Sequence, residues 1–163
     1  MALSLRLSQE ICAYCRQHHH KMTTAESCTG GLLSTYLTAH AGSSHSFCQG
    51  YIVYANDAKM TMLGVPLSCL EAHGAVSQQT AQAMAQGALA HARADIAISI
   101  TGIAGPSGGS AGKPVGTVYM ALIVPRETEV LCQHHHITGS RAEIRQQAAE
   151  RSLRMVHHYL HQP

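Results

Sequence analysis

Residues 24–31 place side chains capable of chemistry where the sequence pattern passes from a strand to a helix. They read Thr-Ala-Glu-Ser-Cys-Thr-Gly-Gly, which brings hydroxyl groups, a thiol and a carboxylate into one short turn. Glycines let the backbone approach a ligand closely, and free N–H groups in a helix's first turn stabilise an anion or a developing oxyanion. A nucleophile would lie here, although Ser27 or Thr29 acting only as a helix cap explains the same residues.

A phenol and an amine occur together in residues 54–59, where a predicted strand gives way to a helix. Lys59 can act as a general base if burial or nearby positive charge lowers its pKa toward neutrality. A Ser–Lys pair is a known variant of the serine-nucleophile scheme. The alternative is a surface lysine that follows a helix cap.

Residues 101–117 hold six of the 14 glycines directly after a predicted strand. Such a loop can surround a ligand with backbone amides, whereas a flexible connector is the alternative. The segment is not a Walker loop, because Gly108 and Gly112 are separated by three residues and Pro114 follows the lysine. The glycine content favours a binding loop.

The 13 histidines raise the question of a metal site. His134 and His136 share a strand face, and His157 and His161 share a helix face. There is no H-E-x-x-H motif, and the Cys12-x-x-Cys15 pair has no second C-x-x-C to complete a four-ligand site. Surface histidines in a chain with only 12% charged residues explain the pattern better than a metal does.

Composition limits the partners of the protein. With 163 residues and 45% hydrophobic content, the chain fits one globular domain. A formal net charge of +2 without a basic cluster, and few aromatic residues, argue against nucleic acid as a partner. The sequence contains neither a signal peptide nor an apolar run of the ~18 residues that span a membrane, so we expect a cytoplasmic protein with reduced thiols.

Apolar periodicity predicts an alternation of helices and strands. We expect helices over residues 4 to about 18–20, about 30–40, 56–63, 77–92 and 140–160, and strands over residues 22–25, 47–54, 95–100, 115–124 and 129–137. Ser77 opens the alanine-rich fourth helix, and Ser140 with Glu143 forms a capping box at the start of the last one. This order predicts an α/β fold in which helices cover a sheet, with antiparallel pairing of the last two strands.

The last helix carries apolar residues on two faces. Ala149 and Leu153 belong to one stripe, and Ile144 and Ala148 belong to the other. The second stripe indicates an oligomer contact, or equally a helix buried within its own subunit.

Four segments together resemble the CinA C-terminal domain family, which includes stand-alone nicotinamide mononucleotide deamidases. They are residues 24–31, residues 54–59 with 62–65, residues 73–77, and residues 101–119. The start of the last helix, with Arg141 and Arg145, is similar to the family's G-x-R-x-x-x-R pattern. The resemblance covers nearly the whole chain and implies that residues 1–163 form a single three-layer α/β/α domain with a mixed sheet.

The resemblance implies hydrolysis of the carboxamide of nicotinamide mononucleotide, with release of ammonia and no metal or organic cofactor. It makes Ser27 the nucleophile, Lys59 its base and Tyr54 a hydrogen-bonding partner that orients the pair. Ala55 departs from the Ser or Thr of many relatives, which alters local polarity. A homodimer or larger homo-oligomer is expected.

On this interpretation the backbone N–H groups of Cys28, Thr29 and Gly30 hold the oxyanion, and Arg141, Arg145 and the amides of the 102–116 loop hold the phosphate. Arg145 is alternatively a structural ion-pair residue, and Cys28 is a rival nucleophile. The remaining substrate-binding candidates are Gly31, Asn56, Thr101, Gly102, Gly105, Gly108 and Gly109. A non-catalytic nucleotide-binding paralogue or a histidine-based metal-binding protein remains an alternative.

Overall fold

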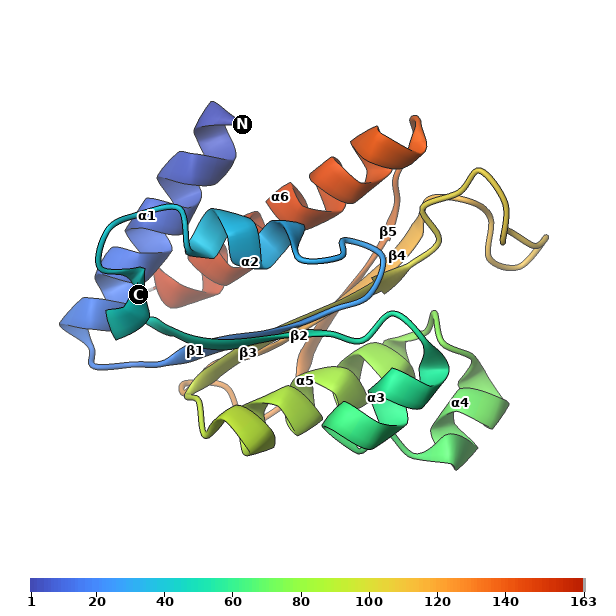
Figure 1. The fold of residues 1–163 in the computed structure, drawn as a ribbon, viewed down its shortest axis with the longest axis horizontal. Coiled ribbons are helices and arrows are strands. Elements are labelled where there is room, and N and C mark those ends of the chain that lie inside the picture. Colours follow the sequence, from blue (N-terminus) through green and yellow to red (C-terminus); the bar gives the residue numbers. More distant parts are fainter. Residues whose placement is uncertain (163) are drawn as a thin grey trace.

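A five-stranded sheet separates two layers of helices in the computed structural model, which describes residues 1–162 (Figure 1). The helices α1, α2 and α6 cover one face, and α3, α4 and α5 cover the other. A short 3-10 turn at Ser43–His45 precedes β2. In chain order the elements are α1 (Ala2–Gln17), β1 (Met22–Glu26), α2 (Leu32–Leu37), β2 (Phe47–Ile52), α3 (Asn56–Leu63), α4 (Leu67–His73), α5 (Gln78–Ala92), β3 (Ile96–Gly102), β4 (Thr117–Ile123), β5 (Leu131–His136) and α6 (Arg141–Leu160).

The strands are arranged in the order β2-β1-β3-β4-β5. The first three are parallel, with Glu26 opposite Ile52 on one side and Ile100 on the other. The pairings of β3 with β4 and of β4 with β5 are antiparallel, so the sheet is mixed as predicted. The carboxyl ends of β1, β2 and β3 therefore meet at one edge, which is where ligands bind in open α/β sheets.

The central strands are buried because helices cover both of their faces. All five residues of β1 are buried, as are the first six of β3, which explains why β3 has no polar alternation. The largest core cluster lies between the sheet and the α1, α2 and α6 layer, around Leu33, Met120 and Leu153. A second cluster around Val53 and Met84 lies on the opposite side, beneath α3 and α5.

Two predicted helix starts are confirmed by their cap hydrogen bonds. The Ser77 hydroxyl accepts from Thr80 N at 3.1 Å. The Ser140 hydroxyl accepts from Glu143 N, and the Glu143 carboxylate accepts from Ser140 N at 2.7 Å, which completes the capping box.

Several predicted boundaries were wrong. The first helix begins at Ala2 rather than Ser4, and α2 covers only Leu32–Leu37 because the backbone before it forms a turn. The predicted strand over 47–54 ends at Ile52, and the two strands that follow β3 are each shorter than expected. The helix α4 was missed, because seven residues with one buried position, Leu70, give too little periodicity.

Both apolar faces of α6 are covered within this chain. Ile144 and Ala148 are as buried as Ala149 and Leu153. The two-faced pattern therefore reflects a helix that packs against both α1 and the sheet, and it gives no support for an oligomer contact.

None of the helices in residues 1–162 is long and apolar enough to cross a membrane.

Candidate active site

Ser27 and Lys59 meet at the carboxyl edge of the parallel strands. Ser27 follows β1 directly, and Lys59 is the fourth residue of α3, which begins soon after the neighbouring strand β2. Lys59 Nζ lies 3.3 Å from Ser27 Oγ. Ser27 is 7% exposed and Lys59 only 1%, so the pair is shielded from bulk water. The two residues lie 32 positions apart in the sequence, and the parallel β1–β2 pairing unites them.

The surroundings of Lys59 favour an uncharged amine. Burial lowers its pKa from the ordinary value of 10.5, because the ammonium form loses its hydration, while the neighbouring Cys28 thiol opposes this shift. Lys59 Nζ also donates to the carbonyl oxygens of Val53 at 2.9 Å and Tyr54 at 3.2 Å. An uncharged amine has two N–H donors and one lone pair. Lys59 Nζ donates to Ser27 Oγ as well as to the two carbonyls, so proton transfer from Ser27 requires the uncharged amine to turn its lone pair toward the hydroxyl.

The turn after Ser27 presents backbone donors. Within residues 1–162, the N–H groups of Cys28 and Thr29 have no acceptor in another residue. The N–H of Gly30 differs from the expectation, since it donates to the Ser27 carbonyl at 3.1 Å and so closes the turn. Two of the three predicted oxyanion donors therefore have no acceptor in another described residue, and the Gly30 N–H stabilises the turn.

Arg145 holds this turn from outside. Its Nε donates to the Cys28 carbonyl at 3.1 Å, and its Nη2 donates to the Thr29 carbonyl at 2.9 Å. In a planar trans peptide the C=O and N–H bonds point in opposite directions, so the Thr29 N–H points away from Arg145. In the described part of the chain Arg145 forms no ion pair. Its contacts hold the carbonyl side of the turn, and the ion pair expected as the alternative does not form among the described residues, while a contact of Arg145 with phosphate stays a prediction.

Glu26 caps α2, a role that the sequence analysis assigned to Ser27 or Thr29. Its fully buried carboxylate accepts from the backbone N–H groups of Gly31, Leu33 and Ser34 at 3.0, 3.1 and 2.8 Å. The Ser34 hydroxyl donates to the same carboxylate at 2.6 Å. Ser27 is thereby free of capping. Glu26 is the last residue of β1, six positions before the first residue of α2, so the sequence carried no local signal for this cap, for which Ser27 or Thr29 was the alternative considered.

The Cys28 side chain packs against Gly102 of β3. This side chain is 4% exposed, and a Cβ built on Gly102 would lie 3.1 Å from its Sγ. Burial raises the pKa of the Cys28 thiol to about 11, so the thiol stays protonated near neutral pH. Gly102 thus leaves room for the Cys28 side chain, and the geometry disfavours Cys28 as the nucleophile.

Tyr54 forms hydrogen bonds through both its phenol and its backbone carbonyl. Its hydroxyl accepts from Arg141 Nη2 at 2.9 Å, and its side chain is 60% exposed. Arg141 Nη1 also donates to the Gly105 carbonyl at 2.6 Å. Arg141 therefore joins the segment after β2 to the glycine-rich loop. Of the polar groups of Tyr54, it is the backbone carbonyl that accepts a hydrogen bond from Lys59.

The other predicted substrate-binding residues divide into two groups. Thr101 is buried and its hydroxyl donates to the Ala75 carbonyl at 2.7 Å, while the Gly31 N–H is taken by Glu26, so neither group is free for a ligand. Asn56, at the start of α3, and Gly108 and Gly109, on the loop that projects beyond the sheet, are exposed. Figure 1 shows this loop extending past the N-terminal end of α6.

Among residues 1–162, no group of three or more His, Cys, Asp or Glu side chains is arranged to hold a metal ion.

Comparison with known proteins agrees with this architecture. The family model for the CinA C-terminal domain matches residues 4–160, and the chain belongs to this family. The competence/damage inducible protein CihA from Agrobacterium tumefaciens has the same fold, with a TM-score of 0.92 at 43% identity over 98% of this chain and 96% of that one.

Sequence relatives are of two lengths. A CinA-like protein from Syntrophobacter fumaroxidans is 52% identical over 86% of this chain, but this match covers only 33% of that relative. The chain thus spans about a third of the length of several curated relatives. The nicotinamide-nucleotide amidohydrolase PncC from Enterobacter agglomerans is 48% identical over 90% of this chain and 89% of its own length.

Proposed function

We propose that this protein hydrolyses the carboxamide of nicotinamide mononucleotide to nicotinic acid mononucleotide and ammonia. The observation that carries the proposal is the 3.3 Å approach of a buried lysine amine to a serine hydroxyl, next to two backbone N–H groups that have no acceptor in another described residue. The near full-length match to a nicotinamide-nucleotide amidohydrolase supports the choice of substrate. The reaction belongs to pyridine-nucleotide salvage in the cytoplasm.

In the first step Lys59 accepts the proton of Ser27 as Ser27 Oγ attacks the carboxamide carbon. A serine hydroxyl is a weak nucleophile, so this proton transfer is what makes the attack feasible. The uncharged amine is suited to the task because its lone pair, once directed at the hydroxyl 3.3 Å away, accepts the proton. The Val53 and Tyr54 carbonyls hold the amine in place throughout.

The negative charge that forms on the carboxamide oxygen is stabilised by the N–H groups of Cys28 and Thr29. Removal of one such donor in an acyl-transfer enzyme typically costs about 10²–10³ in rate. The Lys59 ammonium then gives its proton to the departing nitrogen, which leaves as ammonia. This leaves the nicotinoyl group esterified to Ser27.

Water completes the cycle by the same route in reverse. Lys59 takes a proton from the water that attacks the ester, and returns it to Ser27 Oγ as the carboxylic acid departs. Atoms balance: one amide and one water give one acid and one ammonia. All proton transfers use one base, so no second titrating side chain is needed.

The phosphate of the substrate binds near Arg141, which links Tyr54 to the glycine-rich loop of residues 102–116. An arginine fork suits phosphate oxygens, and amides around Gly108 and Gly109 add further donors. Arg141 already uses two donors for the Tyr54 hydroxyl and the Gly105 carbonyl, which fixes its plane before substrate arrives.

The direct test is ammonia release from nicotinamide mononucleotide. We expect Ser27→Ala and Lys59→Met each to lower kcat by at least about 10³, because each removes a group on which the covalent step depends. Cys28→Ala serves as the neighbouring control and retains most of the activity. Rapid mixing of Ser27→Ala with substrate measures whether binding survives.

The outcomes separate the alternatives. Full ammonia release by Ser27→Ala removes Ser27 from the mechanism, and loss of activity in Cys28→Ala transfers the nucleophile to the thiol. Saturable binding by the wild type without turnover identifies a non-catalytic paralogue. Turnover abolished by a chelator and restored by a metal ion contradicts the metal-free scheme.

We also propose that the protein forms a homo-oligomer. Since α6 is covered within its own chain, the support comes from β2, which is an edge strand, and from exposed apolar side chains. Ile52 on β2, Met62 on α3 and Leu67 on α4 are 53%, 45% and 56% exposed. Isolated exposed apolar residues are common, but the edge of β2 with the exposed Ile52 offers a second copy both hydrogen bonds and apolar area.

A further inference from the structure

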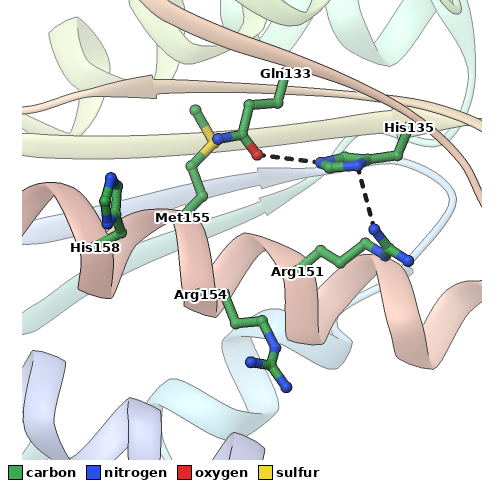
Figure 2. Close-up of a pocket in the computed structure, with 6 residues that line it drawn as sticks. All are labelled: Gln133, His135, Arg151, Arg154, Met155 and His158. Atoms are coloured by element: carbon green, nitrogen blue, oxygen red, sulfur yellow. Dashed lines mark hydrogen bonds between the residues drawn. The ribbon is translucent and has the colours of Figure 1, made fainter.

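A basic hollow lies between the edge strand β5 and the C-terminal half of α6 (Figure 2), and none of its lining residues contributes to the candidate active site. Its volume is about 240 Å³. Arg151 lies ten residues beyond Arg141 on the same helix, which is about 15 Å along the helix axis. The lining residues are Gln133, His135, Arg151, Arg154, Met155 and His158.

A chain of hydrogen bonds fixes the guanidinium of Arg151. Arg151 Nη1 lies 3.4 Å from His135 Nδ1, and His135 Nε2 lies 3.1 Å from Gln133 Oε1, as Figure 2 shows. Burial, Arg151 and His134 each lower the pKa of His135, so its ring is uncharged near neutral pH. The proton then sits on Nε2 and donates to Gln133, and Nδ1 accepts from Arg151.

Arg151 has no negative partner. In residues 1–162 the ion pairs are Arg154 with Glu150 and His157 with Glu10, neither of which involves Arg151. Figure 2 shows Arg151 directed toward β5, whereas Arg154 points away from the strand. A half-buried guanidinium held by a neutral ring keeps its full charge and most of its donors for an outside ligand.

We propose that the basic hollow binds a small phosphorylated metabolite through its phosphate group, at a site separate from the catalytic one. The Arg151 fork matches phosphate oxygens, the Gln133 amide adds a donor, and the buried Met155 side chain supplies an apolar floor. Pockets for drug-sized ligands measure roughly 300–1,000 Å³, so this smaller space accommodates a phosphate and little beyond it.

The test is titration with inorganic phosphate and with pyrophosphate at constant ionic strength, followed by calorimetry and by the imidazole NMR signals of His135 and His158. We expect Arg151→Gln to weaken binding by about tenfold or more, because it removes charged hydrogen bonds. Arg151→Lys keeps the charge but loses the fork, and gives an intermediate affinity. Arg6→Gln, an exposed arginine on α1, is the matched control and leaves binding unchanged.

Other results overturn the proposal. Equal phosphate affinity in Arg151→Gln and wild type excludes the basic hollow as the phosphate-binding site, provided that thermal unfolding shows both proteins to be folded. Binding abolished by Arg141→Gln alone assigns the phosphate to the candidate active site. Binding that sulfate reproduces and that every variant retains is non-specific attraction, and binding of heparin without binding of phosphate indicates a macromolecular surface. No readout requires turnover, so failure here leaves the amidase proposal standing, and the reverse also holds.

Discussion

Burial acts on Lys59 and Cys28 with opposite chemical consequences. Both side chains adjoin Ser27, and each loses hydration of its charged form. For Lys59 the favoured uncharged form is the reactive one, because it carries the lone pair. For Cys28, whose thiol has a pKa of about 11, the favoured uncharged form is the unreactive one. Burial at this position therefore favours the reactive form of Lys59 and the unreactive form of Cys28.

The pH dependence of the reaction follows from the lowered pKa of Lys59. The uncharged amine is the active form, so kcat/KM should rise with pH through the pKa of Lys59 in the free enzyme and then level off. The inflection lies below 10.5, the ordinary pKa of this side chain. Measurement of initial rates of ammonia release across this range, with a coupled assay calibrated at each pH, locates it.

The lowered pKa of Lys59 also makes the stability of the fold, like the rate, increase with pH. Between the folded and unfolded pKa values of Lys59 the unfolded chain binds more protons, so the free energy of unfolding rises with pH there. Lys59→Met lacks this contribution and serves as the reference in matched denaturant titrations. A rate profile that stays flat in this range, or an inflection that persists in a slow Lys59→Met enzyme, contradicts the assignment of Lys59 as the base.

At the level of elements, the start of α2 is attached to the end of β1 by Glu26. Its carboxylate joins the strand to three backbone N–H groups of the helix across the nucleophile turn. Arg145 of α6 holds the opposite side of that turn. The turn that carries the proposed oxyanion donors is thus held by residues of two different elements, β1 and α6.

Glu26→Gln tests this attachment. The amide offers one acceptor oxygen, and its NH₂ group faces donors, so we expect the free energy of unfolding to fall by about 2–3 kcal/mol and kcat to fall with it. Urea titration and ammonia release measure the two effects. KM changes less than kcat, because the carboxylate positions the turn and does not contact substrate.

Asp95→Asn is the control for Glu26→Gln. Asp95 accepts one backbone hydrogen bond, from Lys21 N at 2.7 Å, at the amino ends of the parallel strands, opposite the site. We expect a loss of about 1 kcal/mol or less and an unchanged kcat. If Glu26→Gln has no larger effect on kcat than Asp95→Asn, then the turn does not depend on its carboxylate.

At the scale of the whole molecule, the proposed oligomer makes its own prediction. Light scattering with size exclusion should give a mass of at least twice 17.4 kDa. Ile52→Lys places a charge on the β2 edge and should shift the protein toward monomer, since charged residues block edge pairing. Ala142→Lys, on the exposed side of α6, should leave the mass unchanged. A monomer in the wild type refutes the oligomer.

The order and type of most elements could be predicted because their signals are local. Apolar alternation, the caps at Ser77 and Ser140, and the short spacing between β4 and β5 all act within a few residues. Ser27 and Lys59 were assigned as nucleophile and base from the resemblance to the CinA family, and the structure places the two side chains 3.3 Å apart, while their catalytic roles stay a prediction. The α4 helix could not be predicted, because it is short and weakly periodic.

The sequence alone therefore determined which reactive residue types are present and the alternation of helices and strands. The reactive residues are a serine in a turn that contains glycines and a lysine near the next strand. Only the tertiary structure decided the use of each polar group. Glu26 caps α2, the Gly30 N–H closes the turn, and the Thr101 hydroxyl binds the Ala75 carbonyl. The physical reason is that one donor serves one acceptor, and parallel strand pairing brings competing partners together from distant parts of the chain.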